Sequence, residues 1–296
     1  MTAPEMTAPE LLRAGTRTAA TNVAVDGIGV VTGPASSIEL AADAGRAAID
    51  DAGLPDDAID VLIHVGVYRD QNIVEPAIAA LVQKKIGIGL DYGRGDHHLY
   101  SFDLMNGACG VLSAIAVAGA LLASDAQAVL ITASDVHPGG ADVGRAAGFP
   151  YAPTGAALVL RRTKNRTSAI GFGSLITASG LRDDAPVGYA RIPEVGAAGR
   201  RTIVVEPTSA QELQPLVDDV LARVAPTPAV FAAVPDGVRI IGADVHRVPV
   251  DAHTVGPVLA LAAARERDAR SVTLVAAGGG PEAAALNYQL DEQDSR

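Results

Sequence analysis

The most informative segment of the sequence is Phe102-Asp103-Leu104-Met105-Asn106-Gly107-Ala108-Cys109-Gly110. Residues 111–123 follow it and are apolar and rich in Ala and Leu, so they predict a buried helix that opens at a glycine turn. Cys109 is the only cysteine of the chain. The N-terminus of a helix favours a thiolate, through the helix dipole and free backbone N–H groups. Cys109 is therefore a candidate nucleophile, although a free cysteine also packs well as a small core residue.

Composition limits the class of protein. The chain has 296 residues, enough to bury a large core, and 49% of them are hydrophobic. The formal net charge of −11 argues against a nucleic acid or an anionic membrane surface as the main partner. A single cysteine excludes an internal disulfide, and no apolar run reaches the length of a membrane-spanning helix. We therefore expect a soluble, cytoplasmic protein.

Helical and strand patterns alternate along the chain. Helices are predicted at 38–52, 74–86, 111–123, 213–224 and 258–264, and strands at 59–67, 128–133, 156–160, 229–234, 272–276 and 284–290. The strand pair at 128–133 and 156–160 is similar to the pair at 272–276 and 284–290. The sequence therefore predicts an α/β protein of two repeated halves. We expect a flexible segment at 1–24, a first half at 25–165 and a second half at 166–296.

Several motifs in a fixed order carry a family likeness. They are Ala47-Ala48-Ile49-Asp50-Asp51-Ala52-Gly53-Leu54, Ile59-Asp60-Val61-Leu62-Ile63, Ala108-Cys109-Gly110 and Gly155-Ala156-Ala157-Leu158-Val159-Leu160. On these residues the chain resembles the thiolase superfamily, in particular β-ketoacyl-ACP synthase III and its relatives. The resemblance implies a five-layered αβαβα sandwich, usually a dimer formed through the sheet edges. It also implies that Cys109 carries an acyl group as a thioester.

The run Val74-Glu75-Pro76-Ala77 adds a second resemblance. It looks like a segment of the olefin-pathway thiolases, which condense two acyl thioesters. In those enzymes a glutamate before a proline reaches into the partner subunit's pocket as a base, which implies that role for Glu75. The alternative is a glutamate in the first turn of a helix, where the helix dipole stabilises its charge.

The second half departs from the family pattern in its polar residues. Enzymes of the family use two histidines, or a histidine and an asparagine, to polarise the thioester carbonyl. Asp236 stands where the resemblance implies a histidine, and His253 stands where it implies an asparagine. His253 is therefore the candidate base. His246 competes for either role, and Asn106 is a further candidate beside the cysteine.

The run Gly278-Gly279-Gly280 matches the family's C-terminal glycine loop. The resemblance implies that the Gly279 amide lies beside the Cys109 amide and that the two form an oxyanion hole. Glycines allow a backbone to approach a ligand closely. A tight turn between two strands would explain one glycine more easily than three.

The absence of certain residues limits the substrates and cofactors that we expect for this protein. The Trp and Arg with which the family holds the end of coenzyme A are missing, and the chain has no tryptophan. A carrier-protein thioester is therefore favoured over a conventional grip on acyl-CoA, although both stay candidate substrates. His97-His98 has no cysteine or carboxylate at ligand spacing, so we expect neither a metal nor another cofactor.

Together these features predict a ketosynthase-III-like acyltransferase of a specialised biosynthetic pathway. It would form a C–C bond or transfer an acyl group through Cys109. One alternative is a cyclase that acts on a polyketide-like intermediate with the same fold. The other is a non-catalytic subunit paired with an active ketosynthase homologue. The expected assembly is accordingly a homodimer, or a heterodimer with such a homologue.

Overall fold

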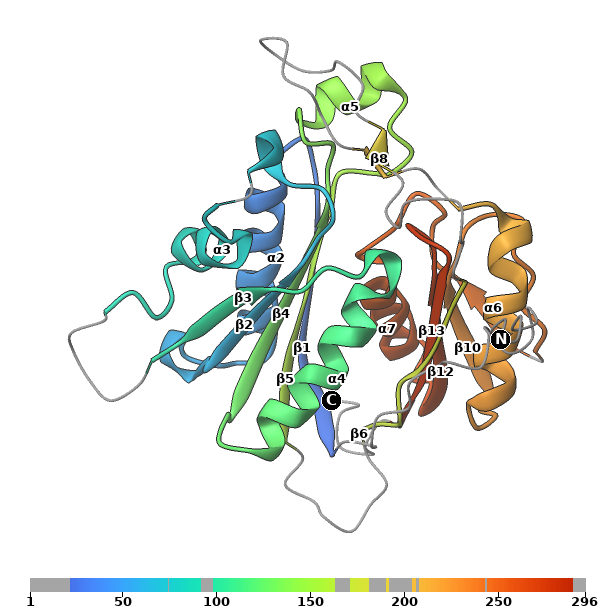
Figure 1. The fold of residues 1–296 in the computed structure, drawn as a ribbon. Helices are drawn as coiled ribbons and strands as arrows, with labels where there is room; N and C mark the ends of the chain where they lie inside the picture. Colours follow the sequence, from blue (N-terminus) through green and yellow to red (C-terminus); the bar gives the residue numbers. More distant parts are fainter. Residues whose placement is uncertain are drawn as a thin grey trace, which may run out of the picture.

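Five layers stack across the molecule, in the order helices, sheet, helices, sheet, helix (Figure 1). This computed structural model describes residues 22–73, 75–91, 98–162, 171–180, 190–191, 204–205, 208–242 and 244–289. No helix among these residues is long and apolar enough to cross a membrane. The layers match the sandwich that the resemblance implied.

The first sheet has five strands in the order β1-β5-β4-β2-β3. They are β1 (Val23–Thr32), β2 (Val61–Val65), β3 (Tyr100–Asp103), β4 (Ala128–Asp135) and β5 (Thr154–Arg162). β2 runs parallel to β3 and β4, while β5 runs antiparallel to β4 and β1. Its outer face is covered by α2 (Ser37–Asp51) and α3 (Ile78–Ile86) (Figure 1).

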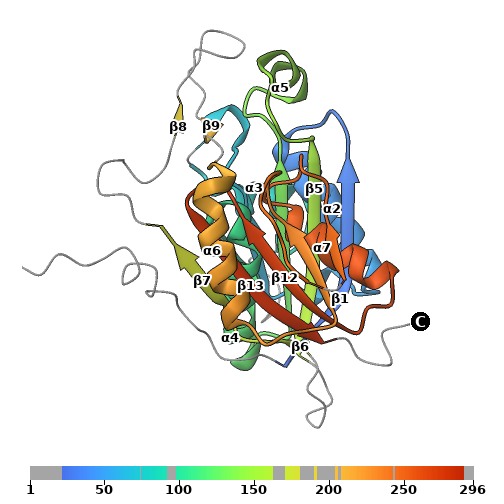
Figure 2. The ribbon, with the colours of Figure 1, turned by 90° about the vertical axis from the view of Figure 1, so that its right-hand side faces the viewer.

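The second sheet repeats this plan with the order β11-β10-β12-β13-β6, and β7 also pairs with β13. Its strands are β6 (Gly171–Phe172), β7 (Ile176–Ser179), β10 (Ala229–Ala233), β11 (Val245–Arg247), β12 (Ser271–Ala277) and β13 (Glu282–Gln289). β10 is parallel to β11 and β12, and β12 is antiparallel to β13. The strands β10 to β13 therefore have the order and directions of β2 to β5. The outer helix α6 (Ala210–Arg223) crosses the sheet in front of β12 and β13 in Figure 2.

The central layer holds α4 (Gly110–Ala123) and α7 (Gly256–Glu266) between the two sheets (Figure 1). Apolar side chains of both helices and both sheets form one continuous core, and Cys109 belongs to it. The remaining elements are short: α5 (Ala141–Ala147), the pair β8 (Ala190–Arg191) and β9 (Val204–Val205), and the 3₁₀ turns η1 (Asp56–Ala58), η2 (Asp70–Asn72) and η3 (Gly107–Cys109). The candidate nucleophile thus lies at the centre of the molecule.

Local signals explain where several elements begin. α2 begins after Ser36, whose side chain accepts the N–H of Glu39 while the Glu39 carboxylate accepts that of Ser36. α3 begins at Ile78, four residues later than the pattern predicted. Asp103 causes this start, because its carboxylate accepts the N–H groups of Ile78 and Ala79 at 3.0 and 2.7 Å.

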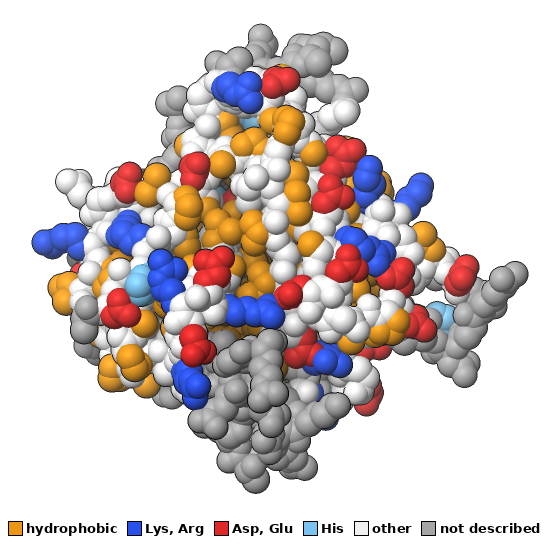
Figure 3. Space-filling model, turned by 180° about the vertical axis from the view of Figure 1, so that it is seen from behind, with side chains coloured by type: hydrophobic (Ala, Val, Ile, Leu, Met, Phe, Trp, Pro, Cys, Tyr) orange, Lys and Arg blue, Asp and Glu red, His pale blue; other side chains and the backbone are white. Residues whose placement is uncertain are grey.

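The surface carries charges of both signs. Seen from behind, Asp and Glu side chains lie among Lys and Arg side chains around a central hollow lined by hydrophobic groups (Figure 3). On this face no large area carries one sign of charge, in spite of the overall charge of −11.

Candidate active site

Cys109 ends the turn η3 directly before α4. Its side chain is 1% exposed, and its Sγ lies 3.5 Å from the carbonyl oxygen of Ala276 in β12. The turn is tied to the glycine loop, because the N–H of Ala108 donates to the carbonyl oxygen of Gly278 at 3.3 Å. Gly107 has a φ of +49°, and a Cβ there would come within 3.0 Å of the same carbonyl oxygen. Only glycine fits this position without strain.

His253 lies beside that turn, just before α7. A Cβ added to Gly279 would overlap Nε2 of His253 and would lie 3.4 Å from the Cα of Gly107, so the imidazole, the glycine loop and the cysteine turn meet there. Nδ1 of His253 is 3.2 Å from Oγ1 of Thr254. Nε2 is buried and has no hydrogen-bond partner among the described residues. This nitrogen is therefore available to a thiol or to a substrate.

A buried carboxylate holds the backbone of His253 in place. Asp135, the last residue of β4, is 0% exposed and accepts the N–H groups of His253, Thr254 and Val255 at 2.9, 3.1 and 3.1 Å. These N–H groups belong to the three residues directly before α7, so Asp135 holds the segment that leads into this helix. Its Oδ1 also lies 3.9 Å from Nδ1 of His253.

Aromatic rings enclose the imidazole of His253. The ring of Tyr151 stacks on it with 4.6 Å between centroids, and the ring of Tyr68 lies 6.0 Å away. Phe149 contacts both tyrosines edge-on, at 4.9 Å from Tyr68 and 5.3 Å from Tyr151. The hydroxyl of Tyr68 is buried and makes no hydrogen bond of normal length among the described residues, although the Tyr151 hydroxyl is near enough to raise its pKa.

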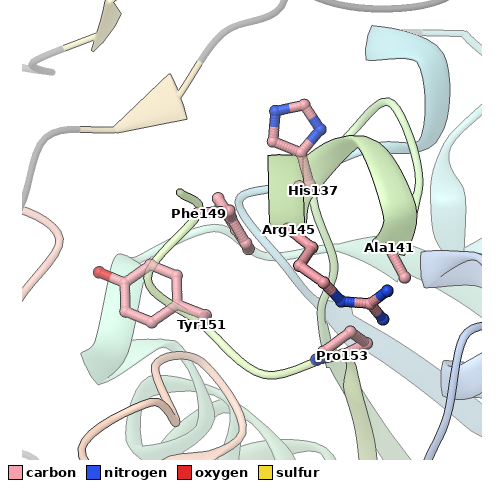
Figure 4. Close-up of a pocket in the computed structure, with 7 residues that line it drawn as sticks. His137, Ala141, Arg145, Phe149, Tyr151 and Pro153 are labelled. Atoms are coloured by element: carbon pink, nitrogen blue, oxygen red, sulfur yellow. The ribbon is translucent and has the colours of Figure 1, made fainter. Parts of the chain in front are cut away.

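A cavity of about 150 Å³ lies between this ring cluster and α5. It is lined by His137, Ala141, Gly144, Arg145, Phe149, Tyr151 and Pro153. In Figure 4, Phe149 and Tyr151 lie on one side of it and Arg145 and Ala141 of α5 on the other. Tyr151 both lines the cavity and stacks on His253, so its ring separates the cavity from the imidazole.

Burial controls the charge of the two central groups. It raises the pKa of the Cys109 thiol, and the nearby carboxylate of Glu282 raises this pKa further. Burial also lowers the pKa of His253, against the opposing effect of Asp135. The site therefore holds a neutral thiol and a neutral imidazole at neutral pH, whereas the position at a helix end predicted a thiolate. A thiolate can then form by proton transfer to the imidazole.

Glu75 lies apart from this group within its own chain. It is exposed and precedes α3, whose first turn contains no acidic residue. The interpretation as a first-turn glutamate is therefore wrong, because Asp103 binds the N–H groups at that end of the helix.

Two other candidates lie outside the group that contains Cys109. Asp236 is exposed in the turn after β10, although its neighbour Pro235 would touch a Cβ placed on Gly278. His246 lies in β11, where its ring stacks on Phe231 at 4.6 Å and its Nε2 is 2.9 Å from the Asp244 carboxylate. The imidazole and the carboxylate of the Asp244-Val245-His246 run therefore pair with each other.

Asn106 precedes the cysteine turn, and its amide donates to Oγ of Ser113 in α4 at 3.0 Å. This contact braces the start of the turn. His97 lies outside the described residues, and within the described part of the chain no three His, Cys, Asp or Glu side chains cluster as metal ligands would.

The sequence reasoning missed three polar residues of this region: Asp135, Tyr68 and Glu282. Asp135 and Tyr68 stand at and just beyond the carboxyl ends of the buried strands β4 and β2. Functional groups of open α/β sheets gather at the carboxyl ends of the strands, so this position in the sequence could have indicated both residues. Glu282 lies two residues beyond the glycine loop, at the start of β13.

Comparison with known proteins supports the fold more strongly than the activity. Crystal structures of OleA from Xanthomonas campestris match 90–91% of this chain and 97–99% of theirs. A cysteine-to-alanine variant has a TM-score of 0.69 at 14% identity, and a complex with lauric acid and lauroyl-CoA a TM-score of 0.64 at 15%. β-Ketoacyl-[acyl-carrier-protein] synthase III from Cereibacter sphaeroides is 39% identical over 98 residues. That match spans 33% of this chain and 27% of the relative. No family model matches the chain.

The chain therefore has the thiolase-like α/β fold of OleA, and the resemblance noted in the sequence is confirmed at the level of the fold. Part of its sequence is similar to a β-ketoacyl-ACP synthase III.

Proposed function

We propose that the protein is a condensing enzyme that takes an acyl group from a thioester onto Cys109 and joins it to a second acyl thioester. One observation carries the proposal: the turn that ends at a buried thiol meets the glycine loop and an imidazole nitrogen that has no hydrogen-bond partner among the described residues. The similarity to β-ketoacyl-ACP synthase III supports an acyl thioester as substrate, as does the OleA complex with lauroyl-CoA. Acyl-ACP and acyl-CoA are the candidate donors.

The first half-reaction loads the thiol. Sγ of Cys109 attacks the carbonyl carbon of the thioester, while its proton passes to Nε2 of His253. We assign the backbone amides of Cys109 and Gly279 as the oxyanion hole for the negatively charged oxygen. The donor's thiol leaves with the proton from the imidazole, and the acyl group stays on Cys109.

The second half-reaction forms the carbon–carbon bond. A second acyl thioester loses a proton, or carbon dioxide if it carries a carboxyl group, and becomes an enolate. The enolate carbon attacks the acyl carbonyl carbon on Cys109, and the sulfur leaves as a thiolate. We assign Glu75 as the base that removes this proton in the partner subunit's site.

The edge of the first sheet supports a dimer that would allow this exchange. β3 is the last strand of that sheet, and Tyr100 at its start is 72% exposed. Met105, just beyond its end, is 59% exposed. An exposed strand edge with apolar side chains favours pairing with a second chain. Glu75 precedes α3, which is anchored to Asp103 at the end of this strand.

Subunit mixing tests the proposal together with its assignment of Glu75. We expect the wild type to release thiol and form a β-ketoacyl product from lauroyl-CoA or a shorter acyl thioester, measured by mass spectrometry. Cys109→Ala and Glu75→Gln should each be inactive alone. Mixed dimers should regain activity, because one site then combines an intact Cys109 with the partner's intact glutamate. No recovery on mixing would contradict a base donated between subunits.

A non-catalytic subunit of a heterodimeric ketosynthase is the second candidate. It is favoured by Asp236, which is exposed where the resemblance implied a histidine. Under this alternative the wild type forms no product with any donor, and it co-purifies from its source with a homologue that is active.

A further inference from the structure

Tyr68 lies in the loop after β2, and its side chain faces the candidate active site. It is 1% exposed, and its ring contacts the rings of His253, Tyr151 and Phe149. The ring is thus held on several sides, and its hydroxyl has a fixed position. None of the roles assigned above uses this hydroxyl.

The hydroxyl of Tyr68 and Nε2 of His253 are both buried, and neither makes a hydrogen bond of normal length among the described residues. The Tyr151 hydroxyl is near enough to the Tyr68 hydroxyl to raise its pKa. Burying a polar group without a partner costs free energy, so such atoms are rare in folded proteins and need an explanation. Among the described residues three such atoms belong to one cluster of rings, the third being Nε2 of His137, whose ring contacts Phe149. His253 joins this cluster to the cysteine turn. A substrate carbonyl oxygen would accept a hydrogen bond from the Tyr68 hydroxyl, and from Nε2 of His253 in the tautomer that carries the imidazole proton there.

The chemistry of the proposed reaction needs such a donor. An enolate formed from an acyl thioester carries its charge on the carbonyl oxygen, and two donors are expected to stabilise it. Among the described residues the group around Cys109 contains one imidazole, because Asp236 is exposed and His246 stacks on Phe231. Burial raises the pKa of Tyr68, so its hydroxyl keeps its proton and acts as a donor at neutral pH.

We propose that the Tyr68 hydroxyl donates a hydrogen bond to the carbonyl oxygen of the second acyl thioester, and to the enolate formed from it. The proton stays on Tyr68, so the residue stabilises charge and forms no covalent bond. This inference rests on the proposed condensing function and adds a catalytic residue that neither the motifs nor the resemblance assigned. It places a phenol where the family pattern implied a second imidazole.

Tyr68→Phe tests the inference because it keeps the ring and removes only the oxygen. The enzyme is first loaded at Cys109 with an acyl-CoA, and the second thioester is then added, so that mass spectrometry follows each half-reaction separately. We expect loading within about threefold of the wild type and condensation slowed by about 10²- to 10³-fold, as for other lost oxyanion donors. The melting temperature should stay equal or rise, because an unsatisfied buried group is gone.

Tyr288→Phe is the matched control. It also removes a tyrosine hydroxyl from a buried residue, but that hydroxyl accepts the N–H of Val25 and lies away from Cys109. We expect wild-type rates for both half-reactions in this control.

Three results would overturn the inference. Wild-type condensation by Tyr68→Phe would show that the hydroxyl is unused, and equal slowing of both half-reactions would show that it does not act on the second thioester. In either case the proposed function survives, since the wild type forms product. If the wild type itself forms no product with any donor pair, the proposed function and the inference fail together.

Discussion

Asp135→Asn is the substitution that tests most directly how the fold holds His253. The Asp135 carboxylate accepts three backbone N–H groups directly before α7. Hydrogen bonds to a charged group contribute about 1.5–3 kcal/mol each, and asparagine keeps one oxygen while turning an NH₂ toward the remaining donors. The N–H groups of His253 and Val255 both bind Oδ2, and only that of Thr254 binds Oδ1, so the asparagine oxygen can keep two of the bonds. With at least one bond lost, the free energy of unfolding falls by about 1.5 kcal/mol or more. For a protein of this size that lowers Tm by at least about 3 °C.

The same substitution also changes the imidazole. Asp135 raises the pKa of His253, so its removal lowers that pKa further below the ordinary value. His253 acts as a base in its neutral form, which is lost as pH falls through its pKa. The acid limb of Cys109 acylation should therefore move to lower pH, while the maximal rate falls because the imidazole is less firmly held. Thermal denaturation and acylation rates measured across pH check both effects.

Asp60→Asn is the matched control. The Asp60 carboxylate accepts the N–H groups of Gln127 and Ala128 at 2.6 and 3.0 Å, at the opposite end of β4 from Asp135. This variant should lose stability but acylate with an unchanged pH profile. If Asp135→Asn melts within about 2 °C of the wild type and acylates at the same rate, the account of this carboxylate is refuted.

Three further predictions concern the glycine loop, a buried histidine and the thiol. Gly279 has a φ of +75°, and Gly279→Ala would place a Cβ on the imidazole of His253, so it should slow acylation about 100-fold. In the control Gly280→Ala the added Cβ meets no atom within 4 Å, and acylation should be normal. Burial lowers the pKa of His64 to about 4 in the folded protein. As pH falls from about 6.5, His64 is therefore protonated in the unfolded chain before it is protonated in the folded protein. The free energy of unfolding should decline by about 3 kcal/mol between pH about 6.5 and pH about 4. We expect the Tm to fall over this range in the wild type and to change less in His64→Gln. Glu282→Gln removes a carboxylate that raises the pKa of Cys109, so iodoacetamide should alkylate the thiol faster at a fixed pH. The alkylation is followed by intact mass, and an unchanged rate would contradict the influence of Glu282 on the thiol.

The framework of the fold was predictable because its signals are local. A run of small apolar residues predicted a helix at 111–123, and α4 spans Gly110–Ala123. The buried strand predicted at 128–133 is β4, which continues to Asp135 because two polar residues at its end still pair with β5. The order of the motifs then implied the five-layered sandwich, which is confirmed.

The site was predictable only where its signal lies within one segment. Cys109 and the glycine loop have such signals, whereas Asp135 and Tyr68 gain their importance from contacts with residues more than 100 positions away. Burial of the thiol is likewise a property of the assembled core, so the helix end alone predicted the wrong direction for its pKa. α5 was missed because it is only seven residues long, contains a glycine and lies between glycine-rich turns.

The decisive measurement is whether Cys109 takes up an acyl group. The wild type and Cys109→Ala are incubated with lauroyl-CoA, shorter acyl-CoAs and acyl-carrier thioesters, and their intact masses are measured. We expect the wild type to gain the mass of one acyl group from at least one donor, and Cys109→Ala to gain none. A wild type that stays unmodified with every donor, or an equal adduct on Cys109→Ala, would contradict this expectation.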